Sequence, residues 1–422
     1  MKYFIRAYLP VLAIILFILA ESAVFLFISP SILSGSSSNA AVSGGGSGVP
    51  DGGKKPGVGQ TGVNQAIDAP SIGAPDSVDS SKLYKYQHIE YQFAGHKSQV
   101  YILEIDPRGM AGLAVKPVLA QDEIFGFENM SSMDSRTGAA ATVNAGFFTT
   151  YGEPSGLVVI DGKLLKKPTG RYPDLLIKDG AASLKQLDSR IYIEAGGGGA
   201  GNNNRIYADQ LNSIAKPGQI VVFTPEFGIW NRVTTANTTI TVKDGMIKGI
   251  STSAGRTMIP ENGFLVTFLG AYSETYFKKR GMIIGARLDL KTDPSIDAEQ
   301  AYECGSWILK GGVDVTKSSD PWVGVLTNRD PRTAVGIKKD NTLVFVVVDG
   351  RQPGYSDGFT AKELAAFLLK YDVRDAAMLD GGASSEMIIN GRMVSKPSFK
   401  GLERAIGGCI ALIPINAPDV LK

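Results

Sequence analysis

The sequence predicts an α+β fold, a largely antiparallel, twisted sheet system with surface helices. Three observations support this prediction. Asp-Gly and Asn-Gly pairs recur between short apolar runs, as in β-hairpins; the run "TLVFVVVDG" has the length and composition of a buried strand; and a helical pattern stands between that run and a second strand, "DAAMLD". The third observation predicts one strand-helix-strand crossover near the C-terminus, in sheets that are otherwise antiparallel.

The first 33 residues predict a transmembrane helix ahead of this fold. Lys2 and Arg6 precede an apolar stretch from Tyr8 to about Leu33, and about 20 apolar residues suffice to cross a bilayer. Positive charge on the short N-terminal side favours a cytoplasmic N-terminus. We therefore expect residues 1–33 to be an uncleaved signal anchor of a single-pass cell-membrane protein with an extracytoplasmic C-terminal domain. Cleavage near Ala40 is the alternative, and it also leaves the domain outside the cytoplasm.

The remainder of the chain predicts a linker and one folded region. Residues 34–80 are rich in Gly, Ser and Pro and lack apolar periodicity, which is typical of a flexible tether. Residues 81–422 then form the predicted domain. The chain carries a net charge of only +2 and no long basic run, so we expect no nucleic-acid partner.

Turn signals and capping residues predict the elements of this domain. Thr360 and Glu363 form a capping-box pattern at the start of the helix "TAKELAAFLLKY". "EMIINGRMV" predicts a hairpin and "RAIGGCIALIPI" a closing strand, whereas residues from about 196 to 325 predict insertions or a subdomain. Type I′ hairpin turns are expected at four dipeptides: Asp161-Gly162, Asp179-Gly180, Asp244-Gly245 and Asn390-Gly391.

Two predicted strands end in the same way, in "VVVDGRQ" and "AAMLDGGASS". The crossover between them brings both C-terminal ends to one edge of a sheet, where ligands commonly bind. Asp349 and Asp380 are therefore candidate acid/base groups. Asp-Gly also makes ordinary turns, and for either aspartate alone that is an equal explanation.

Groups suited to an anion surround these aspartates in the sequence. Arg332, Arg351 and Arg404 stand beside glycine-containing turns, and the planar guanidinium of arginine matches the geometry of phosphate. The segment "GGASS" supplies Gly381, Gly382, Ser384 and Ser385, whose amides and hydroxyls are potential anion donors. Asn144, which follows an earlier strand in "NAGFF", is a candidate for orienting a sugar hydroxyl beside an aromatic ring. Its alternative is a turn residue beside core aromatics.

Several familiar chemistries lack support in the sequence. The only histidines, His88 and His96, lie near the start of the domain, and no zinc or Walker motif occurs. Cys304 and Cys409 are the only cysteines, and their spacing leaves open whether they pair or are simply buried. A calcium ion is a possible cofactor, with oxygen ligands available from several acidic residues: Asp330, Asp349, Asp357, Asp380 and Glu386.

The blocks "NAGFF", "RDPRTAVG", "VVVDGRQPGYSDGF", "AAMLDGGASSEMIINGRMVSKP" and "RAIGG" together resemble the phosphodiester glycosidase domain family. The resemblance spans roughly residues 142–412 and is strongest over 329–412. Ala383 and Ala145 stand where the family often has glycine. The resemblance implies that one set of residues lines the pocket: Asn144, Arg332, Asp349, Arg351, Asp380, Gly381, Gly382, Ser384, Ser385 and Arg404.

The resemblance also implies a function, hydrolysis of a sugar-1-phosphodiester. With the predicted anchor, the expected substrate is a sugar-phosphate-containing glycan of the cell envelope, such as an exopolysaccharide. In this interpretation Asp380 and Asp349 are catalytic, and the remaining pocket residues bind sugar or phosphate. The alternative is a non-catalytic protein that binds or assembles phosphate-containing cell-surface polysaccharide.

Overall fold

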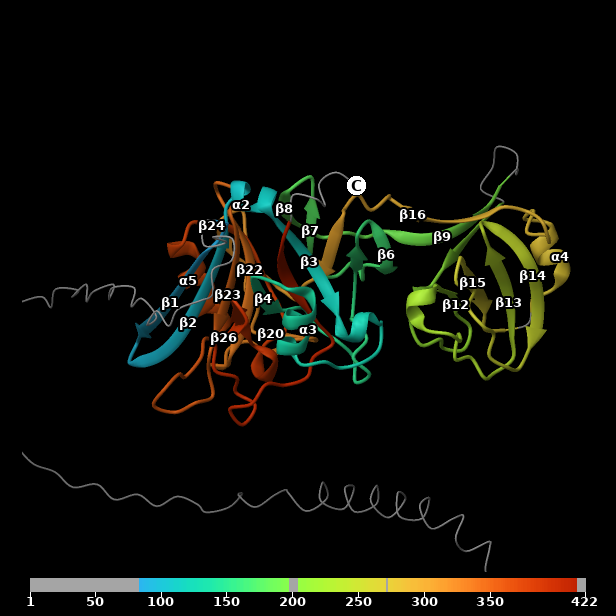
Figure 1. The fold of residues 1–422 in the computed structure, drawn as a ribbon. Helices are drawn as coiled ribbons and strands as arrows, with labels where there is room; N and C mark the ends of the chain where they lie inside the picture. Colours follow the sequence, from blue (N-terminus) through green and yellow to red (C-terminus); the bar gives the residue numbers. More distant parts are fainter. Residues whose placement is uncertain (1–82, 197–203, 271, 416–422) are drawn as a thin grey trace, which may run out of the picture. The chain divides into compact units, whose positions relative to one another are not determined.

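The computed structural model describes residues 83–196, 204–270 and 272–415. The predicted anchor and linker lie outside these ranges. Within the described ranges, every helix is too short or too polar to cross a bilayer. The described chain is mostly antiparallel sheet with few helices, as predicted (Figure 1).

A seven-stranded sheet carries the predicted crossover. Strand β22 pairs antiparallel with both β23 and β24, so β23 and β24 run parallel on either side of it. Their connection contains helix α5, Ala361–Lys370, which confirms the strand-helix-strand prediction. In sheet order, the strands are β1 (Lys85–Phe93), β2 (His96–Ile105), β23 (Leu343–Val348), β22 (Arg332–Lys338), β24 (Val373–Met378), β18 (Trp307–Lys310) and β19 (Val313–Asp314).

Helix α5 forms as its sequence predicts and covers one face of this sheet. The Thr360 hydroxyl accepts a hydrogen bond from the Glu363 amide, and the Glu363 carboxylate accepts one from the Thr360 amide, so the capping box is complete. Leu364, Phe367 and Leu368 are buried in a cluster with alternate residues of β23 and β24. All of β23 is buried, as expected for a strand covered on both faces.

Two five-stranded sheets complete the main core, and their strands share one large cluster with the inner face of the seven-stranded sheet. The first consists of β26 (Arg392–Met393), β25 (Met387–Ile389), β4 (Ala141–Asn144), β27 (Gly408–Pro414) and β3 (Leu113–Leu119); the second consists of β6 (Lys163–Lys166), β5 (Val158–Ile160), β17 (Gln300–Glu303), β7 (Asp174–Lys178) and β8 (Ala181–Lys185). Helices α2 (Pro107–Gly112) and α3 (Met130–Thr137) and the two-stranded sheet β20 (Ser319–Asp320) and β21 (Gly324–Val325) are small additions.

The four predicted hairpin turns are confirmed. At each dipeptide both residues have positive φ, for example +51° at Asp161 and +74° at Gly162, as type I′ turns require. The hairpins are β5–β6, β7–β8, β13–β14 and β25–β26.

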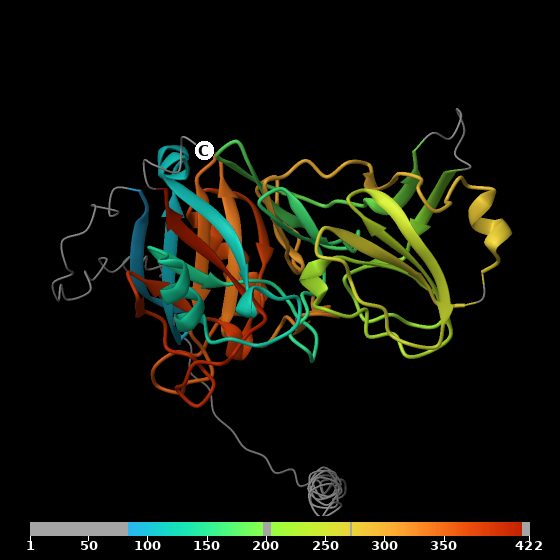
Figure 2. The same ribbon diagram turned by 45° about the vertical axis from the view of Figure 1, so that its right-hand side comes forward.

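Residues 190–293, which we call the inserted subdomain, form two further sheets (Figure 2). Ile193, Val266 and Phe268 belong to a second cluster, whereas Phe223 and Leu265 belong to the main one. Helix α4 covers residues Glu274–Lys278. The sheets are β10 (Arg205–Ala208), β9 (Arg190–Ala195) and β16 (Leu288–Asp293), and β11 (Gln210–Leu211), β12 (Ile220–Phe223), β15 (Gly263–Phe268), β13 (Asn237–Lys243) and β14 (Met246–Ser253).

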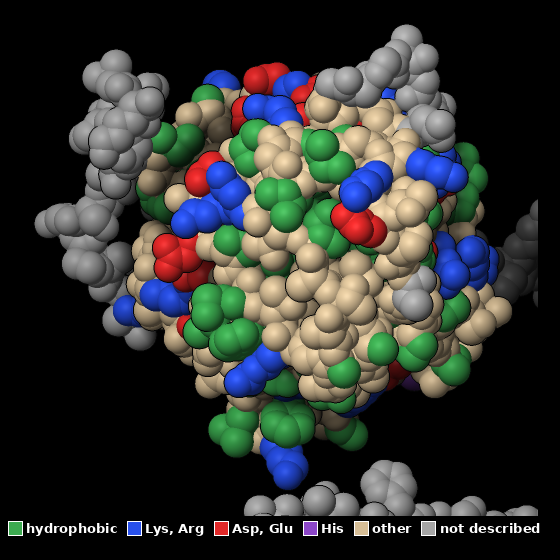
Figure 3. Space-filling model, turned by 90° about the vertical axis from the view of Figure 1, so that its right-hand side faces the viewer, with side chains coloured by type: hydrophobic (Ala, Val, Ile, Leu, Met, Phe, Trp, Pro, Cys, Tyr) green, Lys and Arg blue, Asp and Glu red, His purple; other side chains and the backbone are tan. Residues whose placement is uncertain are grey.

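The surface charges are dispersed, and the two cysteines are unpaired. On the face drawn in Figure 3, Lys and Arg side chains lie in separate small patches among hydrophobic and other side chains. Cys304 and Cys409 are both free and buried, in different clusters. They therefore act as small apolar core residues.

Candidate functional site

A cavity of about 210 Å³ lies at the sheet edge where β23 and β24 end. We call it the strand-end cavity. Six predicted site residues line it: Arg332, Arg351, Asp380, Gly381, Gly382 and Arg404. The other residues around it are Phe147, Trp322, Val323, Asp330 and Ala383. The cavity therefore brings together residues from Phe147 to Arg404, which are far apart in the sequence.

Three arginines from different segments converge on this cavity. Arg332, at the start of β22, is buried, and its guanidinium donates to the carbonyl oxygens of Phe359 (3.0 Å) and Asn328 (2.9 Å). The half-exposed Arg351 donates through Nε to Asp330 at 2.8 Å. Asp330 also lies 3.7 Å from Arg332. Asp330 thus fixes two of the three guanidinium groups, and burial lowers the pKa of Arg332 without removing its charge at neutral pH.

Asp380 is the lining carboxylate at the end of β24. Its backbone is fixed on both sides, because its amide donates to Ala145 O (3.1 Å) and its carbonyl accepts from the Asn144 amide (2.7 Å). Burial raises the pKa of Asp380 to about 6, although the Ser384 hydroxyl and the positive charge of Arg404 act in the opposite direction. The group is therefore ionised above that pH and ready to accept a proton near neutrality.

Gly382 allows the turn after Asp380 to pass close to an arginine. Its φ is +61°, and a Cβ at this position would lie 3.2 Å from Nη1 of Arg351. Its amide donates to Pro331 O at 2.9 Å. Positive φ and a nearby guanidinium both favour glycine at position 382. The second residue of the Gly381-Gly382 pair is therefore explained. Ala383 lies in a short 3₁₀ turn over Gly382–Ser384.

Aromatic side chains form another wall of the strand-end cavity. Phe147 and Trp322 have ring centroids 5.6 Å apart at an interplanar angle of 46°, and the centroids of Tyr172 and Trp322 are 4.2 Å apart at 33°. The Trp322 amide is bound to Asp320 Oδ1 at 2.7 Å, which fixes its loop. An aromatic wall opposite cationic groups suits a ligand that has both an apolar sugar face and a negative charge.

Asp349 occupies the corresponding strand end of β23 but is not among the residues that line the strand-end cavity. It is buried, and its carboxylate accepts from the Tyr101 hydroxyl (2.9 Å) and the Lys396 amide (3.0 Å). Tyr355 is a third donor at 3.3 Å. Burial raises the pKa of Asp349 to about 6, while these donors lower it. The topology puts both aspartates at one edge, but only Asp380 opens to the cavity.

The remaining predicted residues lie behind the lining. Both ends of the Asn144 side-chain amide are hydrogen-bonded within the protein. Its Oδ1 accepts from the Thr333 hydroxyl (2.8 Å), and its Nδ2 donates to the backbone oxygen of Asp380. Ser384 is buried and accepts from Arg404 Nη1 at 3.4 Å. Ser385 is buried, and its hydroxyl has no hydrogen-bond partner among the described residues. These three residues therefore support the lining from behind.

Trp322 was not predicted from the sequence, and Asp330 and Glu386 were predicted only as candidate calcium ligands. One of only three tryptophans in the chain, Trp322 sits in a Pro- and Gly-containing loop, and that was the available signal. Glu386 is buried behind Arg404, whose amide donates to Oε1 at 3.0 Å, whereas Oε2 has no partner among the described residues. Burial raises the pKa of Glu386 to about 8. Within the described part of the chain, no three His, Cys, Asp or Glu side chains gather as a metal site.

The chain is similar to known proteins in sequence and in fold. The sequence model of the family described as phosphodiester glycosidase matches residues 236–413. The predicted resemblance to phosphodiester glycosidases is confirmed. The phosphodiester glycosidase match includes every predicted site residue except Asn144.

Individual relatives align over short segments. The SPbeta prophage-derived uncharacterized protein YomE of Bacillus subtilis is 29% identical over 42% of this chain and 25% of its own length. The N-acetylglucosamine-1-phosphodiester alpha-N-acetylglucosaminidase of Bos taurus is 38% identical over 24% of this chain and 18% of its own length. The chain thus matches a quarter or less of these curated relatives.

Solved structures with a similar fold include a cyanobacterial protein. The crystal structure of a hypothetical protein from Synechocystis superposes with a TM-score of 0.67 at 19% identity, covering 79% of this chain and 62% of that chain. At this identity the likeness concerns the fold alone.

Proposed function

We propose that this chain is a membrane-anchored, extracytoplasmic hydrolase that cleaves sugar-1-phosphodiester bonds of a phosphate-containing envelope glycan. The observation that carries the proposal is the strand-end cavity, where Asp380 faces three arginines and an aromatic wall. The family match supports the reaction class, and the name of the bovine relative records an N-acetylglucosamine-1-phosphodiester. The anchor rests on the apolar segment at residues 1–33.

The arginines provide the charge for a phosphate. Nη1 of Arg332 and both terminal nitrogens of Arg351 have no hydrogen-bond partner among the described residues, so they are available as donors. Donors that are fixed before the substrate arrives stabilise developing charge without reorganisation in the transition state. In this proposal, Arg332, Arg351 and Arg404 bind the phosphodiester and stabilise the phosphate as it leaves the anomeric carbon.

Asp380 is the carboxylate that acts on the sugar. A phosphate leaving group carries its own negative charge and needs little protonation, so a single ionised carboxylate is sufficient. Asp380 either accepts a proton from the attacking water or attacks the anomeric carbon directly. Retaining and inverting glycosidases of the two-carboxylate type differ in the separation of their carboxylates, and only one carboxylate of the predicted pair lines this cavity.

Asp349 and Asn144 are positioning residues in this proposal. Asp349 holds the Lys396 amide and Tyr101 and stands two residues before Arg351. Asn144 holds the carbonyl of Asp380. Such supporting groups keep reacting side chains within the narrow tolerance that catalysis needs.

The test is incubation of the whole purified chain with a panel of sugar-1-phosphodiesters, with and without added calcium, and detection of free sugar by mass spectrometry. We expect release from at least one compound and none with Asp380→Asn. Calcium dependence would assign a cofactor that the geometry alone does not. Binding of these compounds without release would overturn the hydrolase proposal and favour a glycan-binding or assembly protein.

A further inference from the structure

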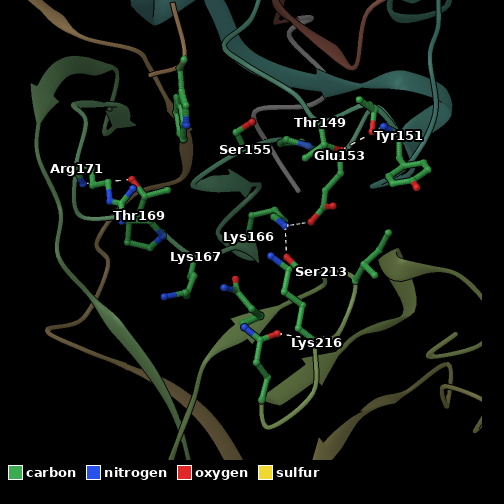
Figure 4. A pocket seen from close by; sticks show the side chains of 17 residues that line it. Thr149, Tyr151, Glu153, Ser155, Lys166, Lys167, Thr169, Arg171, Ser213 and Lys216 are labelled. Atoms are coloured by element: carbon green, nitrogen blue, oxygen red, sulfur yellow. Dashed lines mark hydrogen bonds and ion pairs between the residues drawn. The ribbon is translucent and has the colours of Figure 1, made fainter. Parts of the chain in front are cut away.

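A second, larger cavity of about 610 Å³ borders the strand-end cavity. We call it the basic cavity; Figure 4 shows its side chains. One wall comes from residues 149–155 and 166–171, and the other from residues 210–219 of the inserted subdomain. Trp322 lines both cavities. A ligand that extends past Trp322 from the strand-end cavity therefore enters the basic cavity.

The basic cavity has an excess of positive charge. Lys166, Lys167, Arg171 and Lys216 line it, and Glu153 is its only lining carboxylate. Lys166 is paired with Glu153, which leaves three formal positive charges. Lys167, Arg171 and Lys216 have no ion-pair partner among the described residues, and Arg171 and Lys216 are exposed. Clefts lined by one sign of charge concentrate ligands of the opposite sign.

The buried ion pair fixes the walls of the basic cavity. Lys166 binds Glu153 on its own wall and reaches across to the Ser213 hydroxyl on the other (Figure 4). It also donates to the carbonyl oxygen of Asn212 at 3.3 Å. A buried, fully partnered charge of this kind is costly to break. The cavity is therefore held open before any ligand binds, and the three unpaired cations are free for recognition.

The other lining groups match a polyhydroxylated ligand rather than a lipid. Hydroxyl and amide side chains predominate: Thr149, Thr150, Tyr151, Ser155, Thr169, Gln210, Ser213 and Gln219. Glu303, which accepts from the Thr169 amide at 2.8 Å and from its hydroxyl, fixes one of them. The volume lies within the range of typical ligand sites. Sugar hydroxyls with regularly spaced negative charges fit this lining.

We infer that the basic cavity is a second subsite that binds an anionic segment of the same glycan whose sugar-1-phosphodiester occupies the strand-end cavity. The substrate class is then a polyanionic chain with repeated phosphate groups, not a single phosphorylated sugar, and Trp322 lies where the two subsites meet. This inference rests on the proposed function for the cleavage step, but the binding of a polyanion by the basic cavity is measurable without catalysis.

The binding test uses a fluorescent poly(glycerol phosphate) oligomer, a probe without a scissile sugar, and fluorescence anisotropy at low ionic strength. The variant is Lys167→Gln/Arg171→Gln/Lys216→Gln. We expect its Kd to rise about tenfold, since each partly exposed charge contributes modestly and screening is weak. The control is Lys243→Gln/Lys248→Gln/Lys279→Gln, three exposed lysines of the subdomain that do not line the basic cavity. It should bind within about twofold of the parent.

The catalytic test compares two substrates that share the sugar released in the panel. One is its phosphomethyl diester, and the other carries a poly(glycerol phosphate) oligomer on the phosphate. The triple variant of Lys167, Arg171 and Lys216 should have a lower kcat/KM than the parent for the substrate that carries the oligomer, and an unchanged kcat/KM for the methyl diester. If the triple variant binds the oligomer with the Kd of the parent, or if the lysine control loses as much affinity as the triple variant, the inference is overturned even if the methyl diester is cleaved. If neither substrate is cleaved but the difference in Kd persists, the proposed hydrolase fails and the polyanion site stands.

Discussion

The ends of β23 and β24 begin with the same local sequence, a buried strand followed by Asp-Gly, yet their surroundings differ. Asp349 is enclosed by Tyr101, Tyr355 and the Lys396 amide. Asp380 faces a cavity with three arginines. In both cases burial raises the pKa to about 6, so the pKa alone does not separate them. The two aspartates differ in whether they line the cavity. The residues packed around a strand-end aspartate therefore determine whether it can contact a ligand.

The largest expected effect is on turnover, and it separates the two aspartates. Asp380→Asn should lower kcat by about a thousandfold or more, because it removes the carboxylate that acts on the sugar. Asp349→Asn should lower kcat by only about tenfold, through displaced supporting groups. The measurement is kcat on the best substrate of the panel, with circular dichroism as the folding control. Equal losses would show that both aspartates are catalytic and would remove the distinction.

The glycines after the two aspartates provide the second comparison. Gly382→Ala forces a Cβ against the Arg351 guanidinium at φ +61°, so we expect a loss of about tenfold in kcat/KM, with a small loss in stability. Gly350→Ala places a Cβ 2.7 Å from the backbone nitrogen of Pro331, and backbone does not yield as a side chain does. That variant should lose about 2 kcal/mol or more of stability.

Kinetics and urea unfolding of both glycine variants check this prediction. A Gly382→Ala variant with full activity would show that the position of Arg351 is unimportant, and a Gly350→Ala variant of normal stability would contradict the close backbone approach at the end of β23.

The third prediction concerns Glu386 behind the strand-end cavity. Its pKa in the folded protein, about 8, lies above the ordinary value of about 4.3 for the unfolded chain. The folded state therefore holds this proton more tightly, and the associated stability is lost as pH rises from about 4.3 through 8. Between pH 5 and 8 the free energy of unfolding should fall about 3 to 4 kcal/mol more in the parent than in Glu386→Gln.

Urea unfolding at several pH values measures the slope for the parent and for Glu386→Gln. Parallel curves for the two proteins would mean that Glu386 is ionised in the folded state. Asp380→Asn is a second comparison. The carboxyl of Asp380 has a pKa of about 6 in the parent, so its effect on the free energy of unfolding falls in the lower part of the same pH range.

The smallest expected effect belongs to Ala383, which lines the strand-end cavity. Ala383→Gly should change kcat/KM by no more than about twofold and lower stability by about 0.5 to 1 kcal/mol, because glycine loses more backbone entropy on folding. A large gain in activity would show that the alanine methyl group restricts the substrate.

The local elements of this protein follow from short-range features of its sequence. Asp-Gly pairs require positive φ at both turn positions, Thr360 and Glu363 cap one helix, and a continuous apolar run gives a strand buried on both faces. These are short-range constraints, so a single sequence reveals them. The same reasoning predicted the crossover, and with it the common edge of Asp349 and Asp380.

Which polar groups share a cavity depends on long-range contacts in the folded protein, and the local sequence does not reveal it. The sequence around Asp349 does not predict its contact with Tyr101 of β2. The sequence around Asp380 likewise does not predict that Trp322 lines the same cavity or that the Asn144 side-chain amide binds its carbonyl oxygen. The inserted subdomain likewise supplies Lys216 to a cavity whose other cations come from residues 166–171. Such contacts join distant segments through sheet order and burial, and burial then determines whether a carboxylate is enclosed or open to a ligand.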